Sequence, residues 1–143
     1  MREVMEKIKN DIQEHGLHVM SVCGDDIQSF SYTIGLEETF KHPEIIMSGL
    51  DTKLMHALLN DIAKLIEGGE AYSDGDLSDQ VLKNYPVKFV SVTNENAEAY
   101  LRAAGAYYDP ASFRALQCVW PDSHGHFQRH SNNEQTILSV ENA

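Results

Sequence analysis

The sequence predicts an α+β fold, built on a mainly antiparallel sheet or a split-barrel-like, partly open barrel and flanked by two longer helices. Strand-like segments follow one another as hairpins, and two long helical patterns occur without strict alternation of strand and helix. The 143 residues suffice to bury one core without disulfides or metal, and no linker or repeat interrupts them. We therefore expect a single domain over residues 1–143.

The first third of the chain predicts a helix followed by a β-hairpin. Apolar residues recur at three- and four-residue steps over residues 1–15, and Gly16 follows as a helix stop. Two strand-like runs, 17–23 and 27–36, flank the turn residues 24–26 and complete the hairpin.

The clearest helical pattern begins after Asp51, a residue suited to cap it, and ends at Gly68 and Gly69. The apolar stripe that should face the core consists of Leu54, Met55, Leu58, Leu59, Ile62, Leu65 and Ile66. The acidic segment 70–79 is predicted as a solvated loop, because its aspartates lack the closing glutamate of a calcium-binding EF-hand loop.

The second half of the chain predicts further strands and one short helix. Asn94 should cap this helix, and Gly105 should end it. A proline, an aspartate and a glycine within 121–125 favour a tight turn. The helix is expected over 95–104, and the strands are expected over 85–93, 114–120, 126–128 and 136–140.

The composition bears on partners and location. The formal net charge is −11, and lysine and arginine are scattered, so we expect no nucleic acid and no anionic membrane as partners. A small anionic ligand is compatible with this balance, because a few local cations can hold one. The charged N-terminus contains no apolar run long enough for a signal peptide or a membrane span, which predicts a cytosolic location. Cys23 and Cys118 lie in separate strand-like runs and are predicted as buried, reduced thiols rather than a disulfide.

A polar loop between two apolar runs is the candidate functional region. The runs 30–36 and 44–48 are strand-like, and Pro43 precedes the second of them. The charged and polar residues of the loop are Glu37, Glu38, Thr39, Lys41 and His42. Small proteins commonly place ligand contacts on polar segments that join buried strands.

His42 and Glu44 are the candidate catalytic pair. Residues two apart in an extended strand face the same side, so the two side chains could converge on one site. A histidine–carboxylate pair suits general-base chemistry or the orientation of a ligand. The alternative is a structural role, in which His42 bonds a backbone carbonyl and Glu44 bonds a backbone amide.

Aromatic and amide side chains supply the other candidates. Tyr107, Tyr108, Gln117 and Trp120 suit stacking and hydrogen bonding with a planar ligand, or else a core role with satisfied polar tips. The ligand-binding residues that we predict are Tyr32, Glu37, His42, Glu44 and Trp120. No metal site is predicted, because zinc needs three or four convergent ligands, and His124 and His126 occupy a predicted turn.

Three segments carry a family resemblance: YTIGL at 32–36, HPEIIMSGL at 42–50 and LQCVWPDSHGHF at 116–127. Their order and spacing resemble a bacterial family known as domain of unknown function 4262, and the resemblance covers nearly the whole chain. The family pattern continues after the last segment with a Pro-Trp pair, whereas Gln128 and Arg129 stand here. A weaker resemblance to flavin-binding split barrels rests on the Tyr-Thr-x-Gly strand and concerns the fold alone.

These observations favour a small-molecule-binding α+β domain for a nucleotide- or cofactor-like ligand. One alternative is a hydrolase or transferase that uses His42 as general base. Another is a protein-interaction module whose acidic surface meets a basic partner. The sequence lacks a Gly-x-Ser-x-Gly elbow, a Walker loop, a dinucleotide glycine pattern and a Cys-x-x-Cys pair, which removes several common enzyme classes. It specifies no cofactor and no oligomeric state.

Overall fold

Six strands form one open, mixed sheet that is mostly antiparallel, in the order β1-β2-β3-β6-β5-β4. The computed structural model describes residues 2–24, 27–82, 85–108, 113–121, 127 and 138. The strands are β1 (His18–Gly24), β2 (Ile27–Ile34), β3 (Glu44–Ser48), β4 (Leu77–Ser78), β5 (Val87–Ser91) and β6 (Ala115–Val119). The helices are α1 (Arg2–His15), α2 (Leu36–Phe40), α3 (Thr52–Glu67), α4 (Asn94–Tyr100) and α5 (Arg102–Tyr107). The sheet has two distinct edge strands, β1 and β4, so the described part forms an open sheet and no closed barrel.

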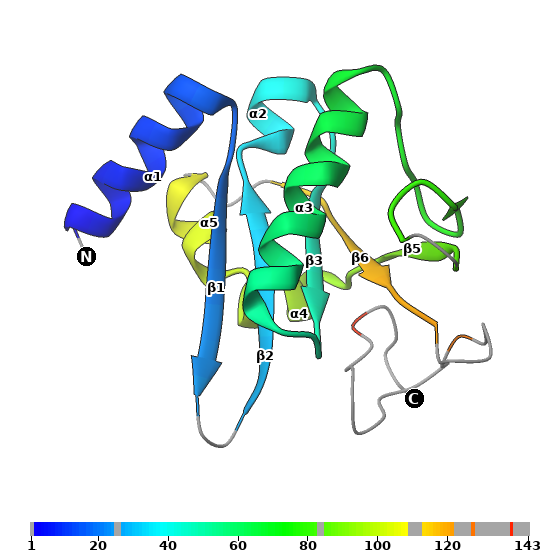
Figure 1. Cartoon of the computed structure of the whole chain (residues 1–143). Helices are drawn as coiled ribbons and strands as arrows, with labels where there is room; N and C mark the ends of the chain where they lie inside the picture. The colour runs from blue at the N-terminus through cyan, green and yellow to red at the C-terminus, as the bar shows by residue number, and fades with distance from the viewer. Residues whose placement is uncertain are drawn as a thin grey trace.

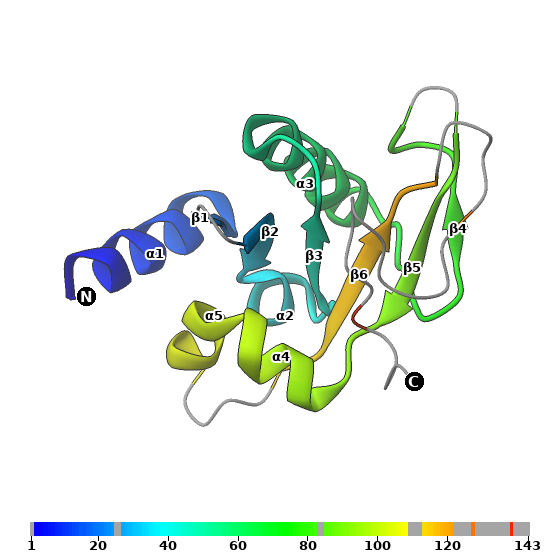
Figure 2. The ribbon, with the colours of Figure 1, turned by 90° about the horizontal axis from the view of Figure 1, so that it is seen from below.

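Helices cover both faces of the sheet. α3 lies across one face, whereas α4 and α5 lie against the other (Figure 1). α1 lies beyond the β1 edge, as the view along the sheet shows (Figure 2). Among the described strands, β3 and β6 form the parallel pair, in which Glu44 is the partner of Ala115. This pairing brings the segment before β3 next to Arg114, the residue that precedes β6.

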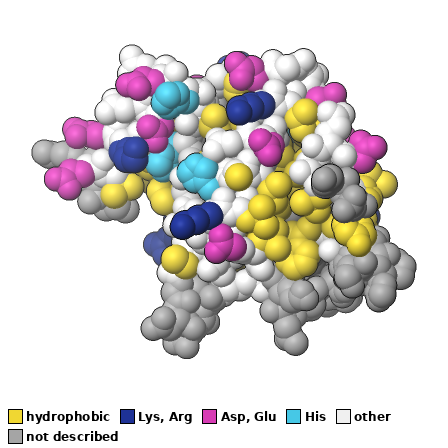
Figure 3. Space-filling view, viewed as in Figure 1, with side chains coloured by type: hydrophobic (Ala, Val, Ile, Leu, Met, Phe, Trp, Pro, Cys, Tyr) yellow, Lys and Arg dark blue, Asp and Glu magenta, His cyan; other side chains and the backbone are white. Residues whose placement is uncertain are grey.

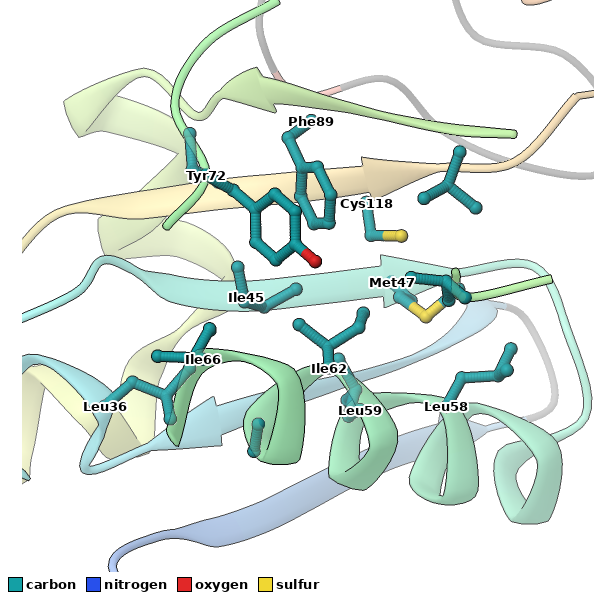
Figure 4. Close-up of a cluster of buried hydrophobic side chains, with 14 of the residues drawn as sticks. Leu36, Ile45, Met47, Leu58, Leu59, Ile62, Ile66, Tyr72, Phe89 and Cys118 are labelled. Atoms are coloured by element: carbon teal, nitrogen blue, oxygen red, sulfur yellow. The ribbon is translucent and has the colours of Figure 1, made fainter. Parts of the chain in front are cut away.

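The face of α3 that meets the sheet forms the first hydrophobic cluster (Figure 4). The Asp51 carboxylate caps the helix by accepting hydrogen bonds from the amides of Lys53 and Leu54 at 3.0 and 3.3 Å. The buried residues of this helix are Met55, Leu58, Leu59, Ile62, Ala63 and Ile66, which confirms most of the predicted stripe. Leu54 is 45% exposed, because it lies at the margin of the stripe and not at its centre.

A second hydrophobic cluster fills the other face of the sheet. Ile8 and Ile12 of α1 pack there with Phe30 and Ile34 of β2 and with Leu101, which lies between α4 and α5. The two clusters account for both flanking long helices that the sequence predicts. No described helix is long and apolar enough to cross a membrane.

Several predicted elements differ from the structure. The segment 37–42, predicted as a loop, contains most of helix α2. The helix predicted over 95–104 divides at Leu101, whose ψ of 57° is not helical, and Thr93 rather than Asn94 caps its first part. The acidic loop contains the short strand β4, which pairs antiparallel with β5, and its Asp76 and Asp74 accept hydrogen bonds from the amides of Ser73 and Ser91.

Two further outcomes concern the cysteines and the C-terminal segments. Cys118 is buried as predicted, but Cys23 is exposed, because it lies on β1 at the edge of the sheet. Both cysteines are free thiols. The predicted turn and the strands over 126–128 and 136–140 lie almost entirely outside the described residues.

Candidate functional site

Glu44 is a buried carboxylate at the start of β3, and it accepts five hydrogen bonds. Its Oε1 accepts from the Thr33 hydroxyl at 2.7 Å and from the Leu36 amide at 3.1 Å. Its Oε2 accepts from the Gly35 amide at 2.9 Å, from the Glu37 amide at 3.2 Å and from the Tyr108 hydroxyl. Because every partner donates, the geometry is that of an ionised carboxylate.

This carboxylate explains why the segment after β2 forms a helix. The first amides of a helix have no intrahelical acceptor, and Glu44 accepts from those of Leu36 and Glu37. Gly35, at φ 120°, reverses the chain just before them. Burial raises the pKa of Glu44, whereas its hydrogen bonds from Tyr108, Thr33 and the amides act in the opposite direction.

Tyr108 connects this carboxylate to the other end of the chain. Its hydroxyl donates to Glu44 and accepts from the amides of Gly35 and Glu38 at 3.1 and 3.3 Å. Burial, and then the nearby Glu44 charge, hold the pKa of Tyr108 far above its ordinary value. The adjacent Tyr107 donates to Glu38 Oε1 at 2.5 Å, and burial together with that carboxylate raises the pKa of Tyr107 to about 12. Both tyrosines therefore stay protonated near neutral pH and act as hydrogen-bond donors to carboxylates.

His42 is buried and forms hydrogen bonds through both ring nitrogens. Its Nε2 accepts from the Tyr72 amide at 2.9 Å, so Nδ1 carries the proton and donates to the Pro43 carbonyl at 2.8 Å. The His42 and Glu44 side chains do not converge on one site, because β3 begins at Glu44 and the alternation of a strand does not extend back to His42. His42 bonds a backbone carbonyl and Glu44 bonds backbone amides, which are the contacts that the structural alternative predicts.

The buried, neutral His42 predicts that acid destabilises the protein. Burial lowers the pKa of His42 below its ordinary value of 6.5, so below pH 6.5 the unfolded chain binds a proton that the folded protein excludes. The stability due to this group is complete above pH 6.5 and is lost as the pH falls. We expect the wild type to lose up to about 1.4 kcal/mol per pH unit more than His42→Gln does between pH 6.5 and 5, measured by urea unfolding. Parallel pH profiles of the two proteins would contradict this expectation.

Arg114 and Glu37 form a two-point ion pair across the chain. The guanidinium Nη2 lies 2.6 Å from Glu37 Oε2, and Nε donates to Oε1 at 3.1 Å. Nη2 also donates to the Lys41 carbonyl at the end of α2, at 3.0 Å. The hydrogen bond from Arg114 holds the pKa of Glu37 below its ordinary range. The pair fixes α2 to the start of β6 and fixes the orientation of the guanidinium plane.

A cleft of about 820 Å3, the Arg114 cleft, adjoins this pair. Its lining residues are Glu37, Glu38, Lys41, Asn94, Ala97, Glu98, Gly105, Tyr108, Phe113 and Arg114. A second hollow of about 410 Å3 shares Asn94, Ala97, Phe113 and Arg114 and continues to Pro43 and Asp74. Each of the two hollows is of the size that small-molecule sites occupy in proteins.

The structure brings only some of the predicted ligand-binding residues together. Glu37 lines the Arg114 cleft, and Glu44 lies directly beneath it through its bond to Tyr108. Tyr32 is buried on the α5 side of the sheet, where its hydroxyl accepts from the Ala103 amide at 3.0 Å. Trp120 donates from Nε1 to the Ser48 carbonyl at 2.8 Å and packs against the first hydrophobic cluster. Neither Tyr32 nor Trp120 is among the residues that line the cleft.

Sequence reasoning missed Arg114 and underestimated Tyr108. Both residues lie more than 60 positions from their carboxylate partners, and no local pattern marks them. Tyr108 was identifiable only as an aromatic candidate. The doublet that it forms with Tyr107 is the sequence signal that could have marked this residue.

The fold and the site together define a class of protein: an open, mostly antiparallel α+β domain in which a buried glutamate organises the segment between two strands. The chain belongs to the family described as Domain of unknown function (DUF4262), whose sequence profile matches residues 11–132. This membership confirms the family resemblance of the three segments. Neither a curated protein nor a solved structure matches the chain.

Proposed function

We propose that the protein binds a small polar molecule, of the size of a nucleotide or cofactor fragment, in the Arg114 cleft. The observation that supports the proposal most is the state of the Arg114 guanidinium. Its Nε and Nη2 donate to Glu37, and Nη2 also donates to the Lys41 carbonyl. Nη1 forms no hydrogen bond within the described residues. The Arg114 side chain is 63% exposed, and its bonds to Glu37 hold the guanidinium in place. The two N–H groups of Nη1 are therefore available to a ligand in the cleft.

The lining of the cleft suggests the chemistry of the ligand. Arg114 and Lys41 are cations that suit an anionic group, such as a carboxylate or a phosphate. Asn94 and Glu98 add acceptors for donors elsewhere on the same molecule. Phe113 supplies an apolar wall. A ligand that carries both a negative group and hydrogen-bond donors would satisfy these side chains.

The geometry gives less support to the alternatives. A hydrolase or transferase that uses His42 as general base needs a free ring nitrogen, and both nitrogens bond to the backbone here. An interaction module with an acidic surface stays a hypothesis, since no particular contact surface favours it.

Native mass spectrometry of the protein purified from its own cells tests the proposal. We expect a retained small molecule on the wild type and an occupancy about tenfold lower on Arg114→Lys, which keeps the charge but loses the fork of donors. Arg102→Lys is the matched control, because Arg102 is exposed on α5 and lies outside the cleft. Equal occupancy of wild type and Arg114→Lys, or no retained mass on either, would contradict the proposal. A bound flavin would in addition colour the preparation yellow.

A further inference from the structure

Another cleft, the α1–α3 cleft, lies between α1, β1 and α3. It shares no lining residue with the Arg114 cleft or with the hollow beside it. Its volume is about 510 Å3, within the range of small-molecule sites. Figure 3 shows histidine side chains gathered with lysine or arginine and with acidic side chains over this part of the surface, and the lining contains five basic residues against two acidic ones. In a chain with a net charge of −11, such a local concentration of basic groups is unexpected from composition.

The wall formed by α1 and β1 contains a histidine in a fixed orientation. His18 Nδ1 lies 2.7 Å from Asp11 Oδ2, and the His18 side chain is only 13% exposed. The ring can donate from Nδ1 to the carboxylate, which leaves Nε2 without a partner among the described residues. Lys7 lies 3.5 Å from the same carboxylate, and His15 lies 3.9 Å from Glu14 on the exposed side of the helix. The hydrogen bond from His18 holds the pKa of Asp11 below its ordinary value.

The opposite wall is formed by α3. It contributes His56, Asn60, Lys64 and Glu67, which lie on successive turns of the helix. Lys64 forms no ion pair within the described part of the chain, so its ammonium group is available to a ligand. The two lysines of the lining balance the charges of Asp11 and Glu67.

The floor of the cleft is apolar. Leu17 and Val19 of the β1 segment and Phe40 of α2 line it, together with Ala63 of α3. Basic groups at the rim and apolar side chains at the floor fit a ligand that has an anionic end and an organic body. Inorganic phosphate alone would leave the apolar floor without a contact.

We propose that the α1–α3 cleft binds small organic phosphates, with the phosphate held by Lys64, His56 and His18 and the organic part packed on Phe40. Lys64 supplies a positive charge, His18 supplies an imidazole that Asp11 holds in one orientation, and His56 supplies a second, exposed imidazole on α3. Asp11 acts as a positioning residue, because it orients the His18 ring.

A titration followed by nitrogen–proton correlation NMR on the full chain tests this site with three probes. Phenyl phosphate should shift the amide signals of residues around the cleft and bind about tenfold more tightly than inorganic phosphate, because its ring adds apolar contact. Phenol, which has the ring but no phosphate, should cause no such shifts. Equal binding of phenol and phenyl phosphate, or shifts located at the Arg114 cleft, would overturn the proposal.

Variants on α3 provide a second test of the proposed site. The double variant His56→Ala/Lys64→Ala should weaken phenyl phosphate binding at least about tenfold, because two charge-assisted contacts are lost. Lys53→Ala is the control, since Lys53 is exposed on the same helix outside the cleft, and its affinity should stay within about twofold of the wild type. Both changes lie on the surface, and the same spectra report whether the fold is intact. An unchanged affinity in the double variant would overturn the assignment.

Discussion

Replacing Glu44 with glutamine is expected to destabilise the protein by roughly 2–6 kcal/mol, because about two donors lose their acceptor at about 1–3 kcal/mol each. The amide nitrogen of glutamine cannot accept a hydrogen bond. In one orientation it faces the Leu36 amide and the Thr33 hydroxyl, and in the other it faces two amides and the Tyr108 hydroxyl. The hydroxyls can rotate, but the amides cannot. The loss is measured as the change in the urea unfolding free energy.

The matched control for this change is Glu38→Gln. Glu38 is a carboxylate of α2 that also accepts a tyrosine hydroxyl, that of Tyr107, but it is exposed. We expect its unfolding free energy to change by less than about 1 kcal/mol. If Glu44→Gln instead unfolds like the wild type and loses a bound ligand, the carboxylate serves the ligand and not the fold.

The elements of the fold that the sequence predicts well depend on local patterns. α3 follows from its apolar period and the Asp51 cap, and β3 has the bounds that its apolar run indicates. α2 could not be predicted in this way, because the acceptor for its first amides is Glu44, a residue outside the helix. A cap supplied from the next strand leaves no local signature such as a serine or aspartate before the helix.

The site depends on contacts that no local pattern encodes. The sequence indicates Glu37 only as a polar loop residue. Its partner Arg114 lies beside it because β3 and β6 pair in parallel. His42 and Glu44 do not converge as expected, because His42 lies two residues before β3 begins at Glu44, outside the alternation of the strand. The net charge likewise averages over the surface, so it could not reveal the basic groups of the α1–α3 cleft.

Replacing Gly35 with alanine is expected to be as severe as the change at Glu44. The Cβ atom would lie 2.8 Å from the Gly16 carbonyl oxygen and 3.1 Å from the Leu17 Cα, both of which belong to the backbone. The φ angle of 120° adds a conformational cost for any residue with a side chain. Together we expect a loss of roughly 2–6 kcal/mol in the urea unfolding free energy, with about half from each source.

Gly69→Ala separates these two sources. Gly69 has a nearly equal φ of 117°, but a Cβ there meets nothing within 4 Å, so this variant measures the conformational cost alone. Gly35→Ala should therefore lose about 1–3 kcal/mol more than Gly69→Ala. Equal losses would mean that the turn at Gly16 moves aside freely. A larger loss at Gly35 means that the start of α2 is held against the end of α1, where the Thr39 hydroxyl also donates to the Gly16 carbonyl at 2.8 Å. The contact between Gly35 and the Gly16–Leu17 backbone would then position the amides that bind Glu44, together with the carboxylate itself.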